Sequence, residues 1–181
     1  MKFVRSIVEV IVIAGLAVLT VFVLRQYVFN PYGISGTSMS PSFRNGDYVF
    51  VDQMSYRLRA PRRGEAIVFH GPASNGDDLL KRIIGLPGER VVVKNDKVTI
   101  FNSENPGGMV LDETYLDPST VTTGEADITL GADQYFVMGD NRSVSFDSRS
   151  WGALAAADIV GKVALRIWPP ETTSVFGAEQ Y

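Results

Sequence analysis

The stretch Gly46-Asp47-Tyr48-Val49-Phe50-Val51-Asp52 is the point at which this sequence changes character. It is short, rich in β-branched and aromatic residues, and preceded by a glycine, which is the pattern of a strand that leaves a turn. Similar runs recur along the chain, separated by Gly, Pro, Asn and Asp, at residues 65–69, 90–94, 97–101, 126–130, 134–138 and 159–167. The pair Asn95-Asp96 predicts a tight hairpin between two of these runs. The predicted fold class is therefore mainly β, an antiparallel sheet or barrel-like domain.

Upstream of this stretch lies the only long apolar run, residues 7–24, in which Glu9 is the sole charge. Its length is near the lower limit for a helix that spans a bilayer. Charged and bulky residues follow it instead of the small residues of a cleavage site, so the run predicts an uncleaved transmembrane anchor. A buried core helix is the alternative. Lys2 and Arg5 before the run, against Arg25 after it, favour an N-terminus in the cytoplasm.

These patterns predict three parts of the chain. Residues 1–30 form the cytoplasmic end and the anchor, and residues 31–170 form an extracytoplasmic β domain. Within that domain, residues 90–132 make a small accessory lobe, because the segment 102–125 is rich in Gly, Pro, Ser and Thr. Residues 171–181, which follow Trp168-Pro169-Pro170, form a loose tail.

The composition narrows the possible functions. The chain has 181 residues, which suffice for one ordinary domain and a short anchor. The net charge of −3 and the absence of a long basic block give no support for nucleic-acid binding. Cysteine is absent, which excludes disulfides, thiol nucleophiles and cysteine-ligated zinc. The one histidine, His70, ends an apolar run and is predicted to have no chemical role, and we expect no metal and no cofactor.

A serine-rich stretch, Ile34-Ser35-Gly36-Thr37-Ser38-Met39-Ser40-Pro41-Ser42-Phe43, lies between the apolar run and the first strand. Its turn-prone residues predict an irregular backbone with exposed hydroxyls. An exposed hydroxyl beside a membrane can serve as a nucleophile, whereas the alternative is a plain serine-rich loop that leaves a helix.

A lysine lies within the apolar stretch Asp78-Leu79-Leu80-Lys81-Arg82-Ile83-Ile84-Gly85. If the stretch is a strand, Lys81 shares a face with Leu79 and Ile83, and that face is otherwise apolar. Desolvation disfavours the ammonium form and lowers the pKa of a lysine, as a general base near neutral pH requires. The alternative is a lysine at a strand edge whose ammonium reaches water.

The stretch from Met138 to Gly152 reads Met-Gly-Asp-Asn-Arg-Ser-Val-Ser-Phe-Asp-Ser-Arg-Ser-Trp-Gly. Its density of Asp, Asn, Arg and Ser after an apolar run predicts a hydrogen-bonded turn that supports a site. Asp147 and Arg149 can pair, and Ser145 can hold a neighbouring amine. A solvated loop is the alternative.

These three stretches together resemble the bacterial type I signal peptidase (leader peptidase) family. Ser38-Met39-Ser40-Pro41 looks like the nucleophile box of the family, and Lys81 to Glu89 looks like its lysine box. Gly139-Asp140-Asn141-Arg142, with the serines and charges up to Arg149, looks like its last box. Gly64 to Phe69 is similar to the strand between the boxes. The resemblance runs from the apolar run to about Trp168.

The resemblance implies a serine–lysine dyad that works through an acyl-enzyme. Ser38 would be the nucleophile and Lys81 the general base, and the Ser38 backbone N–H would be an oxyanion donor. Ser145 would orient Lys81, while an Asp147–Arg149 ion pair would fix the loop that carries Ser145. Some family members have a serine hydroxyl as a second oxyanion donor at the position that Gly36 occupies here.

The resemblance also implies the partners and the location. The substrate would be an exported preprotein with small residues at positions −1 and −3, bound as an added strand between Ile34 and the pair Leu79-Leu80, with Gly36 and Met39 also lining its site. The enzyme would be a monomer, a single-pass protein of the bacterial cytoplasmic membrane in contact with the lipid bilayer. Two alternatives remain: a related peptidase dedicated to one precursor such as a pilin, and a non-catalytic anchored β module that binds extracytoplasmic peptides.

Overall fold

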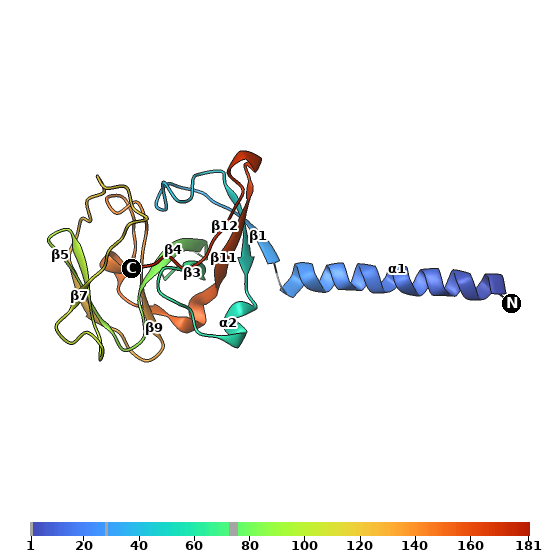
Figure 1. The fold of residues 1–181 in the computed structure, drawn as a ribbon, viewed down its shortest axis with the longest axis horizontal. Coiled ribbons are helices and arrows are strands. Elements are labelled where there is room, and N and C mark those ends of the chain that lie inside the picture. The colour runs from blue at the N-terminus through green and yellow to red at the C-terminus, as the bar shows by residue number, and fades with distance from the viewer. Residues whose placement is uncertain (1, 28, 73–75) are drawn as a thin grey trace.

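The structure, a computed structural model, describes residues 2–27, 29–72 and 76–181, and the side chains of 6–21, 31–72 and 76–181. A single helix, α1 (Lys2–Tyr27), extends away from a β domain that contains the rest of the described chain (Figure 1). The prediction of a mainly β, antiparallel fold is confirmed.

The larger of two antiparallel sheets carries the strands that matter for the site. Its strand order is β1 (Phe29–Gly33), β2 (Tyr48–Asp52), β11 (Ile159–Trp168), β3 (Ala66–His70), β4 (Asp78–Gly85), β9 (Gln134–Met138) and β10 (Leu154–Ala155), and β12 (Ser174–Val175) pairs with β11. The stretch 46–52 thus becomes β2, which joins the strand after the helix to the rest of the sheet.

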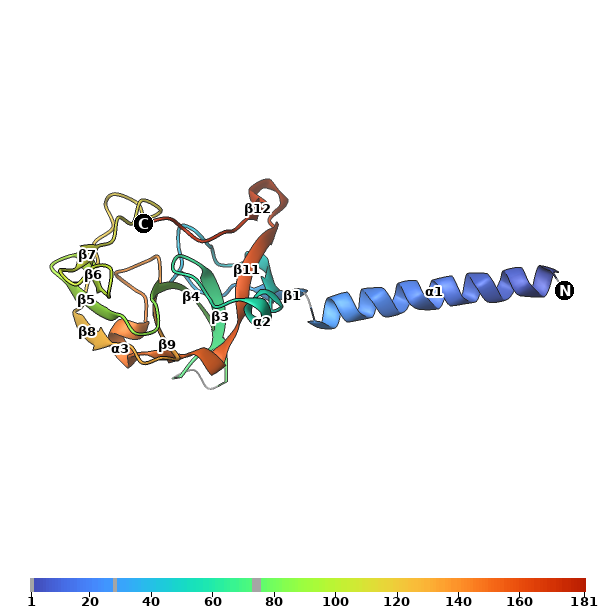
Figure 2. The same cartoon turned by 60° about the horizontal axis from the view of Figure 1, so that its bottom comes forward.

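The second sheet has the strand order β7 (Met109–Val110), β6 (Lys97–Phe101), β5 (Arg90–Lys94) and β8 (Ala126–Thr129). Figure 2 shows it at the end of the domain farthest from α1. Asn95 and Asp96 have positive φ angles of 51° and 61°, as a two-residue hairpin turn with the right-handed twist of strands requires. The remaining described elements are short helices: α2 (Ser55–Leu58), α3 (Ser148–Trp151), η1 (Ala156–Asp158) and η2 (Pro170–Thr172).

The core reaches directly beneath the serine-rich stretch. Met39 and Phe43 are almost fully buried and pack with Val49, Val51 and Val163 of the larger sheet. Burying a side chain of this size is worth about 1.5–3 kcal/mol. The turn that carries Ser38 is therefore held by its own apolar residues and is not a free loop.

The tail follows the surface of the domain. Phe176 packs against Phe43 with ring centroids 4.5 Å apart, and Tyr181 lies partly buried against the core of the second sheet. The sequence predicts a loose tail at 171–181, because the segment follows Trp168-Pro169-Pro170. Phe176 and Tyr181 contact residues far away in the chain, which the sequence of the tail does not reveal.

Among the described residues, no helix is both long and apolar enough to cross a bilayer. Lys2, Arg5 and Arg25, on which the predicted orientation rests, lie outside the described side chains.

Candidate active site

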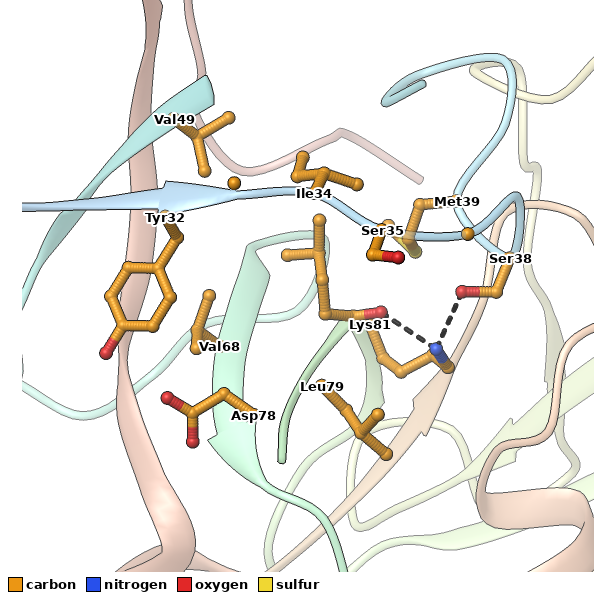
Figure 3. Close-up of a pocket in the computed structure, with 13 residues that line it drawn as sticks. Tyr32, Ile34, Ser35, Ser38, Met39, Val49, Val68, Asp78, Leu79 and Lys81 are labelled. Carbon is orange, nitrogen blue, oxygen red and sulfur yellow. Dashed lines mark hydrogen bonds between the residues drawn. The ribbon is translucent and has the colours of Figure 1, made fainter. Parts of the chain in front are cut away.

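Ser38 lies in a compact turn between β1 and β2. The Ser40 N–H donates to the Thr37 carbonyl at 3.1 Å, and the Phe43 N–H donates to the Met39 carbonyl at 2.9 Å. Met39 is buried and Ser38 is half-buried, and the Ser38 side chain points toward Lys81 of the larger sheet (Figure 3).

The side chain of Lys81 approaches this hydroxyl from β4 (Figure 3). Its Nζ lies 2.8 Å from Ser38 Oγ and 2.9 Å from the carbonyl oxygen of Leu80. The two residues are 43 positions apart in the chain, so the contact depends on the packing of the turn against the sheet. The separation is within the range for a nucleophile and the base that activates it.

The surroundings of Lys81 favour its neutral form. The residue is only 3% exposed, and this burial lowers the pKa of the amine to about 8. The carboxylates of Asp147 and Asp140 act in the opposite direction and raise the pKa, but their effect is smaller than that of burial. A useful fraction of neutral amine therefore exists near neutral pH.

The backbone around Ser38 is anchored by Asn141. The Asn141 N–H donates to the Ser38 carbonyl at 2.9 Å, and the Asn141 amide donates to the Thr37 carbonyl at 3.2 Å. In the part of the chain that the structure describes, the Ser38 N–H has no hydrogen-bond partner. This N–H is thus available to an oxyanion, whereas the Gly36 N–H donates to the Asn45 side chain at 3.0 Å.

Ser145 lies beside this turn but does not bond to the lysine. Its hydroxyl is buried and finds no partner of ordinary hydrogen-bond geometry among the described residues. It lies close enough to the Asp147 carboxylate to contribute to the low pKa of that group. A Cβ on Gly139 would overlap both the Ser145 hydroxyl and the Ser38 carbonyl, so the three residues are in close contact.

Asp147 and Arg149 form a buried, two-armed ion pair, with Arg149 Nη2 2.7 Å and Nε 2.8 Å from the carboxylate oxygens. Burial raises the pKa of Asp147, but the hydrogen bonds and charge of Arg149, with the Gly139 N–H at 3.0 Å, leave it below its usual value. Arg149 also donates to the carbonyls of Thr123 and Arg142, at 2.6 and 2.8 Å. The pair thus fixes the segment that contains Ser145.

A pocket of about 90 Å³ opens beside the Ser38–Lys81 contact. The residues that the sequence singles out for substrate binding, Ile34, Gly36, Met39, Leu79 and Leu80, all line it. The β4 residues before Arg82 pair with β3 on one edge only, because the pairing with β9 begins at Arg82.

The sequence did not reveal the polar residues at the far end of this pocket. Tyr32 and Asp78 both line it, and the Asp78 carboxylate lies 2.6 Å from Nδ1 of His70. Burial first, and then the charge of Asp78, raises the pKa of the Tyr32 phenol. His70 and Asp78 are paired across β3 and β4, but this register is a property of the fold and is not visible in the sequence. Among the described residues, no cluster of three His, Asp or Glu side chains suits a metal ion.

The chain matches known proteins over most of its length. The family model described as "Signal peptidase, peptidase S26" matches residues 7–168. Signal peptidase IB of Staphylococcus aureus (strain COL) is 32% identical over 176 residues, which cover 91% of each chain. Signal peptidase I of Bacillus caldolyticus is 38% identical over 168 residues, which cover 84% of this chain and 87% of the relative.

A crystal structure of a signal peptidase I from Enterococcus faecalis V583 is also similar, with a TM-score of 0.48 and 32% identity over 57% of this chain and 97% of that one. The family model and the curated relatives cover the serine turn, the lysine strand and the segment from Gly139 to Arg149 together. This chain therefore belongs to the signal peptidase family S26.

Proposed function

We propose that this chain removes N-terminal signal peptides from exported preproteins, with Ser38 as the nucleophile and Lys81 as the general base. The observation that carries the proposal is the 2.8 Å contact between Ser38 Oγ and the Nζ of a buried lysine whose pKa is lowered to about 8. Membership of the signal peptidase family supports the substrate class.

In the first half of the reaction, Ser38 Oγ attacks the scissile carbonyl carbon while its proton passes to neutral Lys81. The Ser38 N–H stabilises the oxyanion that forms. When the tetrahedral intermediate collapses, the C–N bond breaks and the Lys81 ammonium returns the proton to the leaving amine, which becomes the N-terminus of the mature protein. The signal peptide remains as an ester on Ser38.

In the second half, Lys81 takes a proton from a water molecule, whose oxygen attacks the ester carbonyl. The ester bond breaks, Ser38 Oγ recovers a proton from Lys81, and the signal peptide leaves with a free carboxylate.

Ser145 orients Lys81 from the side of Gly139, and the Asp147–Arg149 pair holds the segment that carries Ser145. Burial of the Ser145 hydroxyl without a partner of its own supports this role, because an amine that moves during turnover can meet it.

The substrate binds in an extended form between Ile34 and the open edge of β4 at Leu79 and Leu80. The pocket of about 90 Å³ beside Ser38 takes the alanine-sized side chains at positions −1 and −3. Gly36 and Met39 complete the site beside Ser38.

We further propose that residues 1–30 contain a single transmembrane anchor with its N-terminus in the cytoplasm of a bacterium. Residues 31–170 then form an extracytoplasmic catalytic domain at the bilayer surface. This domain includes an accessory lobe at about 90–132. The enzyme acts as a monomer.

The apolar run 7–24, which contains one charged residue, supports the proposed transmembrane anchor. Retention in the membrane after alkaline extraction tests it, and release into the supernatant would contradict it.

Single substitutions in the full chain test the proposed dyad. Ser38→Ala and Lys81→Ala are each expected to abolish cleavage of a preprotein with an Ala-x-Ala site while the fold is retained. Ser42→Ala, in the same turn but with no part in the proposed chemistry, is the matched control and is expected to cleave normally. Normal turnover by either dyad variant would refute the mechanism. Binding of the preprotein without cleavage by the unaltered chain would favour a binding module.

A further inference from the structure

The turn at residues 139–142 sets the position of Ser38, and it is itself held by two buried arginines. Arg82, adjacent to Lys81 on β4, donates to both oxygens of Asp140 at 2.9 and 2.6 Å. Arg142 donates from Nε to the Gly139 carbonyl at 3.1 Å. Each arginine is 1% exposed. The geometry of the turn therefore depends on what fixes these two guanidinium groups.

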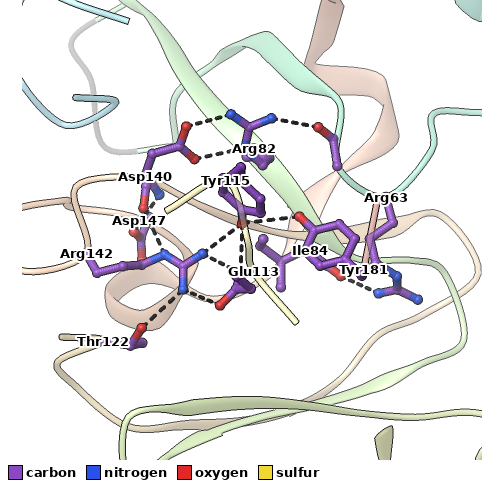
Figure 4. Close-up of polar contacts among 12 residues, drawn as sticks. Arg63, Arg82, Ile84, Glu113, Tyr115, Thr122, Asp140, Arg142, Asp147 and Tyr181 are labelled. Carbon is purple, nitrogen blue, oxygen red and sulfur yellow. Dashed lines mark hydrogen bonds and ion pairs between the residues drawn. The ribbon is translucent and has the colours of Figure 1, made fainter. Parts of the chain in front are cut away.

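Arg142 uses every donor that a guanidinium has. Its Nε–H is bound to the Gly139 carbonyl. Its Nη1 donates to Glu113 at 2.7 Å and to Thr122 at 3.2 Å. Its Nη2 donates to Glu113 at 2.5 Å and to the Tyr115 hydroxyl at 2.9 Å, which accounts for all five N–H groups. Figure 4 shows these partners grouped around the guanidinium. They come from the segment that links β7 to β8, so the second sheet reaches the turn through this segment.

Tyr115 joins the two arginines. Its hydroxyl donates to Glu113 at 2.7 Å and accepts from Arg142. It also accepts from the hydroxyl of Tyr181 at 3.2 Å. These three hydrogen bonds use the one donor and both acceptor positions of the Tyr115 hydroxyl. The guanidinium of Arg82 lies 4.4 Å from the centre of the Tyr115 ring. Tyr181 meets the same ring edge-on at 5.7 Å. Burial raises the pKa of both tyrosines, so both remain protonated donors.

We propose that Tyr115 and Tyr181 are positioning residues for the Ser38–Lys81 pair, acting through Arg142 and Arg82 on the turn at 139–142. This inference rests on the proposed function. Neither tyrosine touches the reacting atoms, and each comes from a segment outside the sheet that carries Lys81.

Loss of the Tyr115 hydroxyl is expected to change the surroundings of Lys81. If the hydroxyl of Tyr115 is removed, one buried N–H of Arg142 loses its partner, and the guanidinium must move or admit water. The turn that packs Gly139 against Ser38 then loosens, and water reaches Lys81. Better solvation stabilises the ammonium and moves the pKa of Lys81 up toward its ordinary value.

Tyr115→Phe in the full chain tests this directly, because it removes the hydroxyl and keeps the ring. We expect kcat to fall about fivefold to tenfold with little change in KM, as for a small misplacement of reacting groups. The pH at which activity is half-maximal on the acid side is expected to rise. Tyr181→Phe, which removes only the outer hydrogen bond, is expected to show the same changes at smaller size.

Tyr56→Phe is the matched control. Its hydroxyl donates to Glu65 at 2.9 Å, Glu65 pairs with Arg59, and the Arg59 guanidinium lies 5.6 Å from the Tyr56 ring. The chemistry resembles that at Tyr115, but this cluster belongs to α2 and the chain before β3. We expect it to lower the melting temperature and leave both kcat and the acid-side pH midpoint unchanged.

The outcomes separate the two proposals. An unchanged kcat and pH midpoint in Tyr115→Phe and Tyr181→Phe would overturn the positioning role, even if both variants melt earlier. The positioning role would also be overturned if Tyr56→Phe shifted the acid-side pH midpoint as much as Tyr115→Phe does. Should Tyr115→Phe fail to fold, the pH midpoint of Tyr181→Phe decides. Failure of the proposed function shows differently, as full activity in Ser38→Ala.

Discussion

At the scale of the residue, Lys81 experiences two opposing influences. Burial lowers the pKa of its amine, and the charges of Asp147 and Asp140 partly restore it, with a result of about 8. A base with this pKa is partly neutral near neutral pH and still basic enough to take a proton from a hydroxyl. The carboxylates therefore limit how far burial weakens the base.

The same shift predicts that Lys81 costs stability. Because the pKa is lower in the folded chain than in the unfolded one, the folded state loses its proton first as the pH rises. This cost in the free energy of unfolding is fully present below the folded pKa of about 8. It disappears as the pH approaches 10.5, the ordinary pKa of lysine, which applies in the unfolded chain. We expect Lys81→Met to raise the free energy of unfolding near neutral pH by on the order of 3 kcal/mol, with the gain shrinking in alkali.

Chemical denaturation at several pH values measures this gain. Lys97→Met, at an exposed position in the β5–β6 hairpin, is the matched control and is expected to show no such dependence on pH. A Lys81→Met variant that is less stable than the unaltered chain near neutral pH would contradict the account of the buried amine.

The residues of the proposed dyad could be predicted from the sequence, but part of their surroundings could not. Alternation along β4 and an otherwise apolar face indicate a buried Lys81. Asp78 and Tyr32 carry no comparable signal, since they meet only when β1 and β4 line one pocket. The hydrogen bond expected between Ser145 and Lys81 is also not formed, although the Ser145 hydroxyl is buried nearby.

At the scale of the element, the segment after β9 holds Ser38 by close backbone contact. Gly139 lies against the Ser38 carbonyl and the Ser145 hydroxyl, and a Cβ there would overlap both. Its N–H is bound by Asp147 at 3.0 Å, so the segment cannot simply move away.

Gly139→Ala is therefore expected to lower kcat by at least about tenfold, because the added methyl group must displace either the turn or Ser145. Gly107→Ala is the matched control: a Cβ there meets nothing within 4 Å, and we expect unchanged turnover. Steady-state cleavage of a preprotein by both purified variants measures the difference. Equal rates for the two would show that the tight contact at Gly139 does not hold the site.

Strands were easier to predict from the sequence than the connections. The runs that became β2, β5, β6, β8 and β9 are rich in β-branched or aromatic residues and are bounded by turn residues. The helices α2 and α3 have four residues each, too few for a helical period. Glu113 and Tyr115 lie in the segment 102–125, which looks like a plain loop, and their role depends on contacts with Arg142 about 30 positions away.

At the scale of the whole molecule, only a short segment of the chain separates the helix from the site. Strand β1 follows α1 almost directly, and Ser38 comes only five residues after the end of β1 at Gly33. The chain from the end of α1 to Ser38 can span at most roughly 40 Å even if fully extended. If α1 lies in a bilayer as proposed, Ser38 must act near the membrane surface, where a translocated signal peptide ends.

The most direct test of the central claim is the pH dependence of acylation at Ser38. The full chain in detergent is treated with a serine-directed acylating inhibitor from about pH 6 to about pH 10, a range that brackets the lowered lysine pKa. Peptide mapping by mass spectrometry then gives the modified residue and its rate of labelling. We predict labelling of Ser38 at a rate that rises with pH around a midpoint near 8. A rate independent of pH over this range, or labelling of a different serine, would contradict it.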